Sequence, residues 1–126
     1  MSESVEAVAR KAYEALTQSF ETGQWDGFFE LFGPEADVIL PAPATGRFTG
    51  AEGRAKAVEF FSNFTAGVAQ LGEVEIIGQT VAADRMIFED RAKGTVGGEP
   101  YEAYHCIHII VQDGKVAGFH EYNRPV

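Results

Sequence analysis

Apolar residues in the first quarter of the chain recur three or four positions apart, which is the spacing of one face of an α-helix. Ser4 can cap the start of this segment, and Gly23 can end it. The pattern therefore predicts an amphipathic helix between them. Its apolar stripe consists of Val8, Ala9, Ala12, Tyr13, Leu16 and Phe20.

Two further helices are expected before residue 65. The segment from about Trp25 to Phe32 is nearly all apolar, which is typical of a short buried helix. Residues 37–40 have the composition of a short strand that Pro41 ends, and residues 45–48 continue as a loop or an edge strand. A third helix is predicted over roughly residues 51–64, where apolar side chains again gather on one face.

After Gly72 the apolar positions alternate with polar ones, as they do in strands. Turn residues at 83–84, 97–98 and 113–114 divide this part into consecutive hairpins, and Asp113-Gly114 favours a type I′ turn. We therefore predict a four-strand antiparallel meander. Together with the helices, it makes residues 1–126 one α+β domain with three helices packed on one face of the sheet.

The third and fourth predicted strands carry apolar side chains on both faces, as shown by Ile107 and Ile109 on one face and Cys106 and Ile110 on the other. One face should meet the helices. A monomer would leave the other face exposed, so we expect a homodimer formed through the sheet, with His108 at the contact.

Charge and composition exclude several classes of function. Ten Lys and Arg residues against 19 Asp and Glu give a formal net charge of −9, which disfavours nucleic acid and anionic membrane surfaces as partners. Cys106 is the single cysteine, so no intrachain disulfide is possible. The acidic start of the chain is unlike a secretory signal, and a cytoplasmic location is expected. His105 and His108 point to opposite faces of a strand, and no metal site is predicted.

Several short motifs, taken in order, resemble those of a known family. They are Gly23-Gln24-Trp25-Asp26-Gly27, Leu31-Phe32 before Asp37-Val38, residues 46–50, Gly98-Glu99-Pro100-Tyr101, Asp113-Gly114-Lys115-Val116 and Glu121-Tyr122-Asn123. The chain resembles the SnoaL-like polyketide cyclases and ketosteroid isomerases of the nuclear transport factor 2-like superfamily. The resemblance implies a cone-shaped fold whose curved sheet surrounds an apolar pocket, and a homodimer.

The resemblance does not extend to the residues that ketosteroid isomerase uses. Aligned through Trp25-Asp26-Gly27 and Asp113-Gly114-Lys115, the positions of its base and its two oxyanion donors hold Leu40, Leu16 and Ile107. All three are apolar. Steroid isomerisation by that machinery is therefore not expected, because a fold alone implies no function.

The best candidate for chemistry is Glu121, which the resemblance turns toward the pocket. Apolar walls would raise its pKa and suit it to acid/base work. The alternative is an ion pair with Arg91 or Arg124 at the sheet edge. His105, on the neighbouring strand, can form an acid/base couple with Glu121 or be a structural histidine.

Other side chains are candidates for binding the substrate. Asn123 and Tyr13 can hydrogen-bond a substrate oxygen, although Tyr13 also fits the packing stripe of the first helix. Glu89 can line the pocket or belong to an exposed charged stretch. The resemblance also turns Tyr101, Ile107 and Phe119 inward.

These residues support two hypotheses. The first is a cofactor-independent isomerase, cyclase or hydratase that moves a proton on a small, mostly apolar carbonyl compound. The second is a noncatalytic ligand-binding or dimerisation module, in which phenylalanines such as Phe28, Phe60, Phe61 and Phe119 fill the pocket. Open volume beside Glu121 would separate the two.

Overall fold

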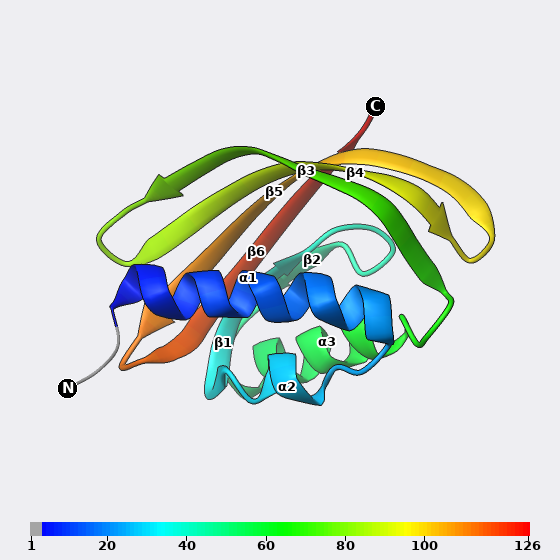
Figure 1. Ribbon diagram of the computed structural model, residues 1–126. Helices are drawn as coiled ribbons and strands as arrows, with labels where there is room; N and C mark the ends of the chain where they lie inside the picture. The colour runs from blue at the N-terminus through cyan, green and yellow to red at the C-terminus, as the bar shows by residue number, and fades with distance from the viewer. Residues whose placement is uncertain (1–3) are drawn as a thin grey trace.

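The computed structural model describes residues 4–126 and shows a strongly curved sheet that arches over the helices (Figure 1). The helices are α1 (Val5–Thr22), α2 (Asp26–Phe29) and α3 (Gly50–Ser62). The strands are β1 (Phe32–Leu40), β2 (Gly46–Phe48), β3 (Ala69–Val81), β4 (Arg85–Val96), β5 (Glu99–Gln112) and β6 (Lys115–Pro125). The α+β prediction, with helices packed on one side of a curved sheet, is confirmed.

The first helix has the predicted ends. The side chain of Ser4 accepts a hydrogen bond from the backbone N–H of Ala7, and Gly23 adopts the left-handed conformation that ends many helices. The second helix is shorter than predicted, because β1 already begins at Phe32. Pro34 lies where the pairing between β1 and β6 is interrupted, so its missing N–H breaks no regular ladder.

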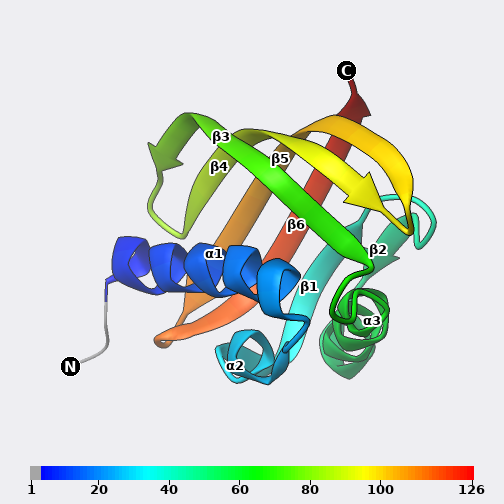
Figure 2. The same cartoon turned by 45° about the vertical axis from the view of Figure 1, so that its right-hand side comes forward.

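Six strands form the sheet, in the order β2-β1-β6-β5-β4-β3. The predicted meander of β3 to β6 is confirmed, since each neighbouring pair is antiparallel. The sequence did not predict that β1 pairs with β6 in parallel, an arrangement that brings residues 37–39 beside residues 118–120. Figure 2 shows the resulting curvature, with β3 and β4 passing over α1.

The turn between β5 and β6 has the predicted geometry. Asp113 and Gly114 have φ angles of 53° and 74°, and a type I′ turn requires two positive values. Just beyond the turn, the register shifts by one residue between Ile110 and Val111. This β-bulge determines which residues of β6 face the helices.

An aromatic cluster fills the narrow end of the fold, below the sheet. The side chains of Phe28, Phe61 and Phe119 are fully buried, with ring centroids 5.4–6.0 Å apart. On the neighbouring surface, α3 packs closely against β1. A Cβ atom at Gly53 would lie 1.8 Å from the carbonyl oxygen of Ala36, so this contact requires glycine.

Within residues 4–126, no helix has the length and apolarity that crossing a membrane requires.

Candidate functional site

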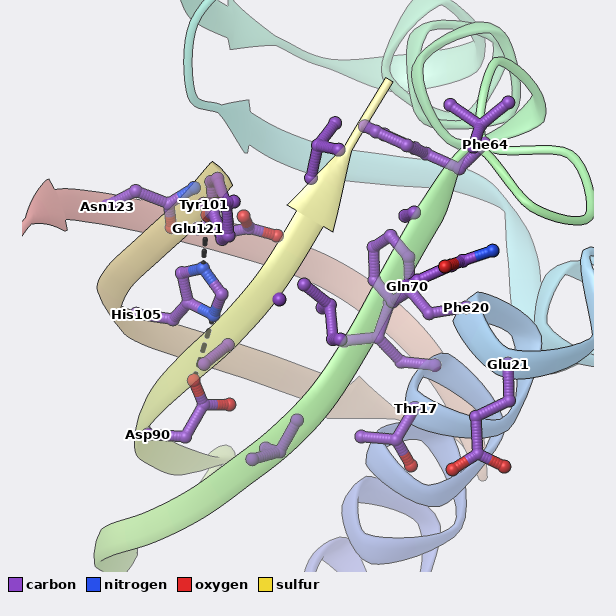
Figure 3. A pocket seen from close by; sticks show the side chains of 18 of the residues that line it. Thr17, Phe20, Glu21, Phe64, Gln70, Asp90, Tyr101, His105, Glu121 and Asn123 are labelled. Atoms are coloured by element: carbon purple, nitrogen blue, oxygen red, sulfur yellow. Dashed lines mark hydrogen bonds and ion pairs between the residues drawn. The ribbon is translucent and has the colours of Figure 1, made fainter. Parts of the chain in front are cut away.

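A cavity of about 1210 Å³ opens between the concave face of the sheet and helices α1 and α3. This volume exceeds the roughly 300–1,000 Å³ of typical small-molecule sites, so a ligand fits with space to spare. Its walls are mostly apolar and come from α1, α3, the loop at residues 41–43 and strands β3 to β6. Figure 3 shows the wall where the polar side chains gather.

Phenylalanines do not fill this cavity. Phe28, Phe61 and Phe119 pack against one another in the core, and only Phe60 of the four expected phenylalanines lies in the wall. Phe119, which was expected to contact the substrate, does not line the cavity, because its ring is buried in the aromatic cluster below it.

Glu121 faces the cavity from β6 and is 8% exposed. The expected alternative, an ion pair with Arg91 or Arg124, is absent from residues 4–126: Arg91 instead pairs with Glu102. Burial raises the pKa of the Glu121 carboxyl group, although the charge of His105 and a contact with Asn123 act in the opposite direction. The shift moves the carboxyl group toward the pH range in which a general acid or base works.

A chain of polar contacts crosses the cavity wall from α1 to β5. The Tyr13 hydroxyl donates a hydrogen bond to Asp90 Oδ2 at 2.5 Å, and Asp90 Oδ1 lies 2.8 Å from His105 Nδ1. The other ring nitrogen of His105, Nε2, lies 2.7 Å from the Tyr101 hydroxyl. Figure 3 shows His105 between Asp90 and Tyr101, with Glu121 beside Tyr101.

Burial shifts the pKa values of the side chains that make these polar contacts. Burial alone would lower the pKa of His105, but contact with Asp90 and the charge of Glu121 outweigh it and raise the pKa above its ordinary value. Burial also raises the pKa of Tyr101 to about 12, so its hydroxyl stays protonated. The pKa of Tyr13 rises for the same reason, and its hydrogen bond to Asp90 adds to the effect.

Sequence analysis did not identify Asp90 as a candidate and pointed instead to its neighbour Glu89. Glu89 is exposed and does not line the cavity, in agreement with the alternative that it belongs to an exposed charged stretch. Successive strand residues face opposite sides, and Asp90 faces the cavity. The signal was present: the two-residue turn at Gly97-Gly98 fixes a register that places Asp90 opposite His105.

The other predicted residues surround these groups. Ile107, Asn123 and Tyr13 line the cavity from β5, β6 and α1. Their roles in binding stay predictions. His108 lies on the opposite face of the sheet, where Nδ1 is 3.2 Å from an Arg85 guanidinium nitrogen. In the described part of the chain, no group of three His, Cys, Asp or Glu side chains is arranged to hold a metal ion.

Glu121 also borders a second, smaller hollow. β1 stops pairing with β6 at Ile39, so within residues 4–126 the last residues of β6 have no strand neighbour on that side. The hollow of about 690 Å³ occupies the gap, and Tyr101, Glu121 and Asn123 line both it and the main cavity.

Comparisons with known proteins agree with this geometry. The sequence profile of the SnoaL-like domain matches residues 9–119. A nuclear transport factor 2-like protein from Anabaena variabilis is 23% identical, with a TM-score of 0.82 over 97% of this chain and 90% of that chain. No curated protein matches the sequence.

Two other solved structures have the same fold at low sequence identity. A proposed SnoaL-like polyketide cyclase from Jannaschia is 19% identical, with a TM-score of 0.62 over 92% of this chain and 87% of that chain. A hypothetical protein from Catenulispora acidiphila with a ketosteroid isomerase-like fold, in complex with trimethylamine, is 14% identical. Its TM-score is 0.66, over 88% of this chain and 83% of that chain.

Proposed function

The chain belongs to the SnoaL-like domain family, and from this premise we propose that it is a cofactor-independent enzyme that moves a proton on a small, mostly apolar carbonyl compound. The reaction class is isomerisation, aldol-type cyclisation or hydration. One observation carries the proposal: a buried carboxyl group with a raised pKa faces open cavity volume beside His105, which contacts Asp90 through one ring nitrogen and Tyr101 through the other. Perturbed ionisable groups gathered in an apolar cavity are typical of acid/base sites.

Glu121 is the proposed base. Its carboxylate takes a proton from the carbon next to the substrate carbonyl, and negative charge moves to the carbonyl oxygen. In isomerisation Glu121 then returns the proton to another carbon of the same compound. In cyclisation the carbanion attacks a second carbonyl, whose π electrons move to its oxygen, and Glu121 returns the proton to the resulting alkoxide. Positioned acid/base groups of this kind typically accelerate such steps about 10²- to 10⁴-fold.

Tyr101 is the proposed donor to the developing oxyanion, assisted by the amide of Asn123. When His105 is protonated, its Nε2–H donates to the Tyr101 oxygen, and the proton of Tyr101 is free to bond the substrate. When His105 is neutral with its proton on Nδ1, Nε2 accepts that proton instead. Asp90 favours the protonated form of His105, and in this way orients the Tyr101 hydroxyl toward the substrate.

Hydrogen exchange in D₂O tests the proton-transfer step without a known product. We would incubate the protein with a panel of small aliphatic and aryl ketones, and follow deuterium incorporation next to the carbonyl by NMR. Amine-bearing ketones belong in this panel, because the Catenulispora relative holds an amine. We expect exchange with the wild-type protein and a loss of at least about 100-fold in Glu121→Gln.

The matched control is Glu35→Gln, which removes the same charge from an exposed position outside the cavity and should leave exchange unchanged. Equal exchange in Glu121→Gln and the wild-type protein would exclude Glu121 as the base.

The alternative is a noncatalytic module that only binds a ligand in this cavity. It is favoured by the apolar residues at the positions that ketosteroid isomerase uses, since Leu16, Leu40 and Ile107 are all buried. Ketones that bind without exchanging would identify the protein as such a module.

We also propose that a second copy of the chain covers the outer face of the sheet. Tyr104 and Tyr122 are 38% and 49% exposed there, beside the partly buried Cys106 and Ile110. Light scattering measures the mass in solution, and a mass equal to one chain of 13.7 kDa at micromolar concentration would exclude the dimer.

A further inference from the structure

The cavity wall carries charge of almost one sign. Four carboxylate residues line it, Glu14 and Glu21 at its rim and Asp90 and Glu121 inside, and no Lys or Arg is among the described residues of the wall. Among the described lining residues, His105 alone can carry a positive charge. A ligand therefore enters a negative field, which the net charge of −9 on the whole chain reinforces.

Of the two carboxyl groups inside the cavity, only that of Asp90 contacts the His105 imidazole. Asp90 receives the Tyr13 hydroxyl and contacts His105 Nδ1, and Tyr101 occupies the remaining ring nitrogen. Glu121 has more than nine-tenths of its surface buried and forms no ion pair within residues 4–126. A buried carboxylate without a cationic partner pays a large desolvation cost, and a cation placed beside it by a ligand removes part of that cost.

The surroundings would strengthen such a pairing. Phe20 lines the cavity from α1, Phe60 from α3 and Phe64 from just beyond the end of α3, and Tyr101 lies beside Glu121 (Figure 3). Aromatic faces attract organic ammonium groups, and apolar walls reduce the screening between opposite charges.

We propose that the carbonyl compound bound in this cavity carries a basic nitrogen, and that its ammonium group is the partner of Glu121. A carboxylate has two oxygens, so one can contact the ammonium while the other accepts the proton from carbon. The neighbouring cation also favours the ionised form that a base requires. Compounds with a carboxylate or phosphate in the same place are excluded by repulsion from Asp90 and Glu121. The inference rests on the proposed function for the carbonyl group, but the charge preference is a property of binding alone.

Three aryl ketones of nearly equal shape test the charge preference. They are 3-(dimethylamino)-1-phenylpropan-1-one, which is cationic at neutral pH, the neutral 4-methyl-1-phenylpentan-1-one, and the anionic 4-oxo-4-phenylbutanoate. Calorimetry at neutral pH and physiological salt gives their dissociation constants. We expect the cation to bind about tenfold tighter than the neutral ketone, and the anion at least about tenfold more weakly than the neutral ketone.

Two variants separate a local pairing from the general charge of the protein. In Glu121→Gln the preference for the cation should fall to about threefold or less, while the neutral ketone keeps its affinity, which shows an intact cavity. In Glu35→Gln the preference should persist, because that carboxylate is exposed and lies outside the cavity wall. The effect of Glu121 should also survive added salt better than a long-range attraction does.

The proposal is overturned if the cation binds no tighter than the neutral ketone, if the anion binds as well as either, or if both variants reduce the preference equally. Failure of the ammonium ketone to bind at millimolar concentration overturns it too. The two proposals fail separately. A cation that binds tightly without exchanging deuterium would contradict proton transfer alone, and exchange without charge preference would contradict the inference alone.

Discussion

Replacing Tyr13 with Phe measures how much the hydrogen bond between Tyr13 and Asp90 in the cavity wall contributes to the stability of the protein. The change removes one hydroxyl and keeps the ring, which is 5% exposed and stacks on Phe88 at a centroid distance of 4.2 Å. The lost contact is the 2.5 Å hydrogen bond to Asp90 Oδ2, a length typical of a hydroxyl bound to a carboxylate.

The expected cost is about 1.5–3 kcal/mol of unfolding free energy, the usual range for a hydrogen bond to a charged group. Unfolding entropy near 60 °C is about 2.1 cal/mol/K per residue, which gives about 0.26 kcal/mol/K for 126 residues. The melting temperature of Tyr13→Phe should therefore fall by about 6–11 °C. Thermal and urea unfolding, followed by circular dichroism, measure both quantities.

The matched control is Tyr104→Phe on the outer face, where the tyrosine is 38% exposed and its hydroxyl has no bonding partner among residues 4–126. Its stability should stay within about 0.5 kcal/mol of the wild-type protein. In an Asp90→Asn background the acceptor is neutral, so Tyr13→Phe should cost about 1 kcal/mol less than in the wild-type protein. Equal small effects of Tyr13→Phe and Tyr104→Phe would refute a strong Tyr13-Asp90 bond.

Three further perturbations follow from positions described above. Gly53→Ala places a methyl group against the Ala36 carbonyl and should lower the free energy of unfolding in urea by about 3 kcal/mol. Gly27→Ala, where a Cβ atom would have no neighbour within 4 Å, should leave it unchanged. Equal effects of the two variants would contradict the close contact between α3 and β1. Glu121→Gln should stabilise the protein in mildly alkaline buffer. The pKa of Glu121 is raised in the folded state, so the wild-type protein loses stability as the pH rises from the ordinary pKa of 4.5 through the folded pKa. The stability gain of the variant should therefore vanish below pH 4.5. Burial lowers the pKa of His120, so the wild-type protein should lose stability as pH falls below the ordinary value of 6.5, and His120→Gln should lose less; parallel pH curves would exclude this contribution.

Local rules predicted the elements of this fold well. Helical spacing and end signals located α1 at both ends, and the pair Asp113-Gly114 identified its turn because few residues tolerate positive φ. The parallel pairing of β1 with β6 was not predictable in this way. It joins residues about 80 positions apart, and no turn connects them.

The site was harder to predict than the fold, because it depends on register. A regular hairpin through Asp113-Gly114 would place Glu121 opposite Cys106, on the outer face of the sheet. The bulge beside Ile110 shifts the pairing by one, so that Glu121 lies opposite Ile107 and faces the cavity. The inward position of Glu121 was predicted from the family resemblance, since the residues alone do not reveal this bulge.

The position of β1 in the sheet has a consequence for the order in which the protein assembles. Until β6 has been synthesised, β1 can pair only with the three-residue strand β2, which leaves its other edge open. The buried residue Val38 stays without its β6 neighbour Phe119 throughout that time. Pairings between distant residues form slowly and expose unpaired edges to other chains. Aggregation during synthesis should therefore begin at β1, and conditions that slow the completion of β6 should increase it.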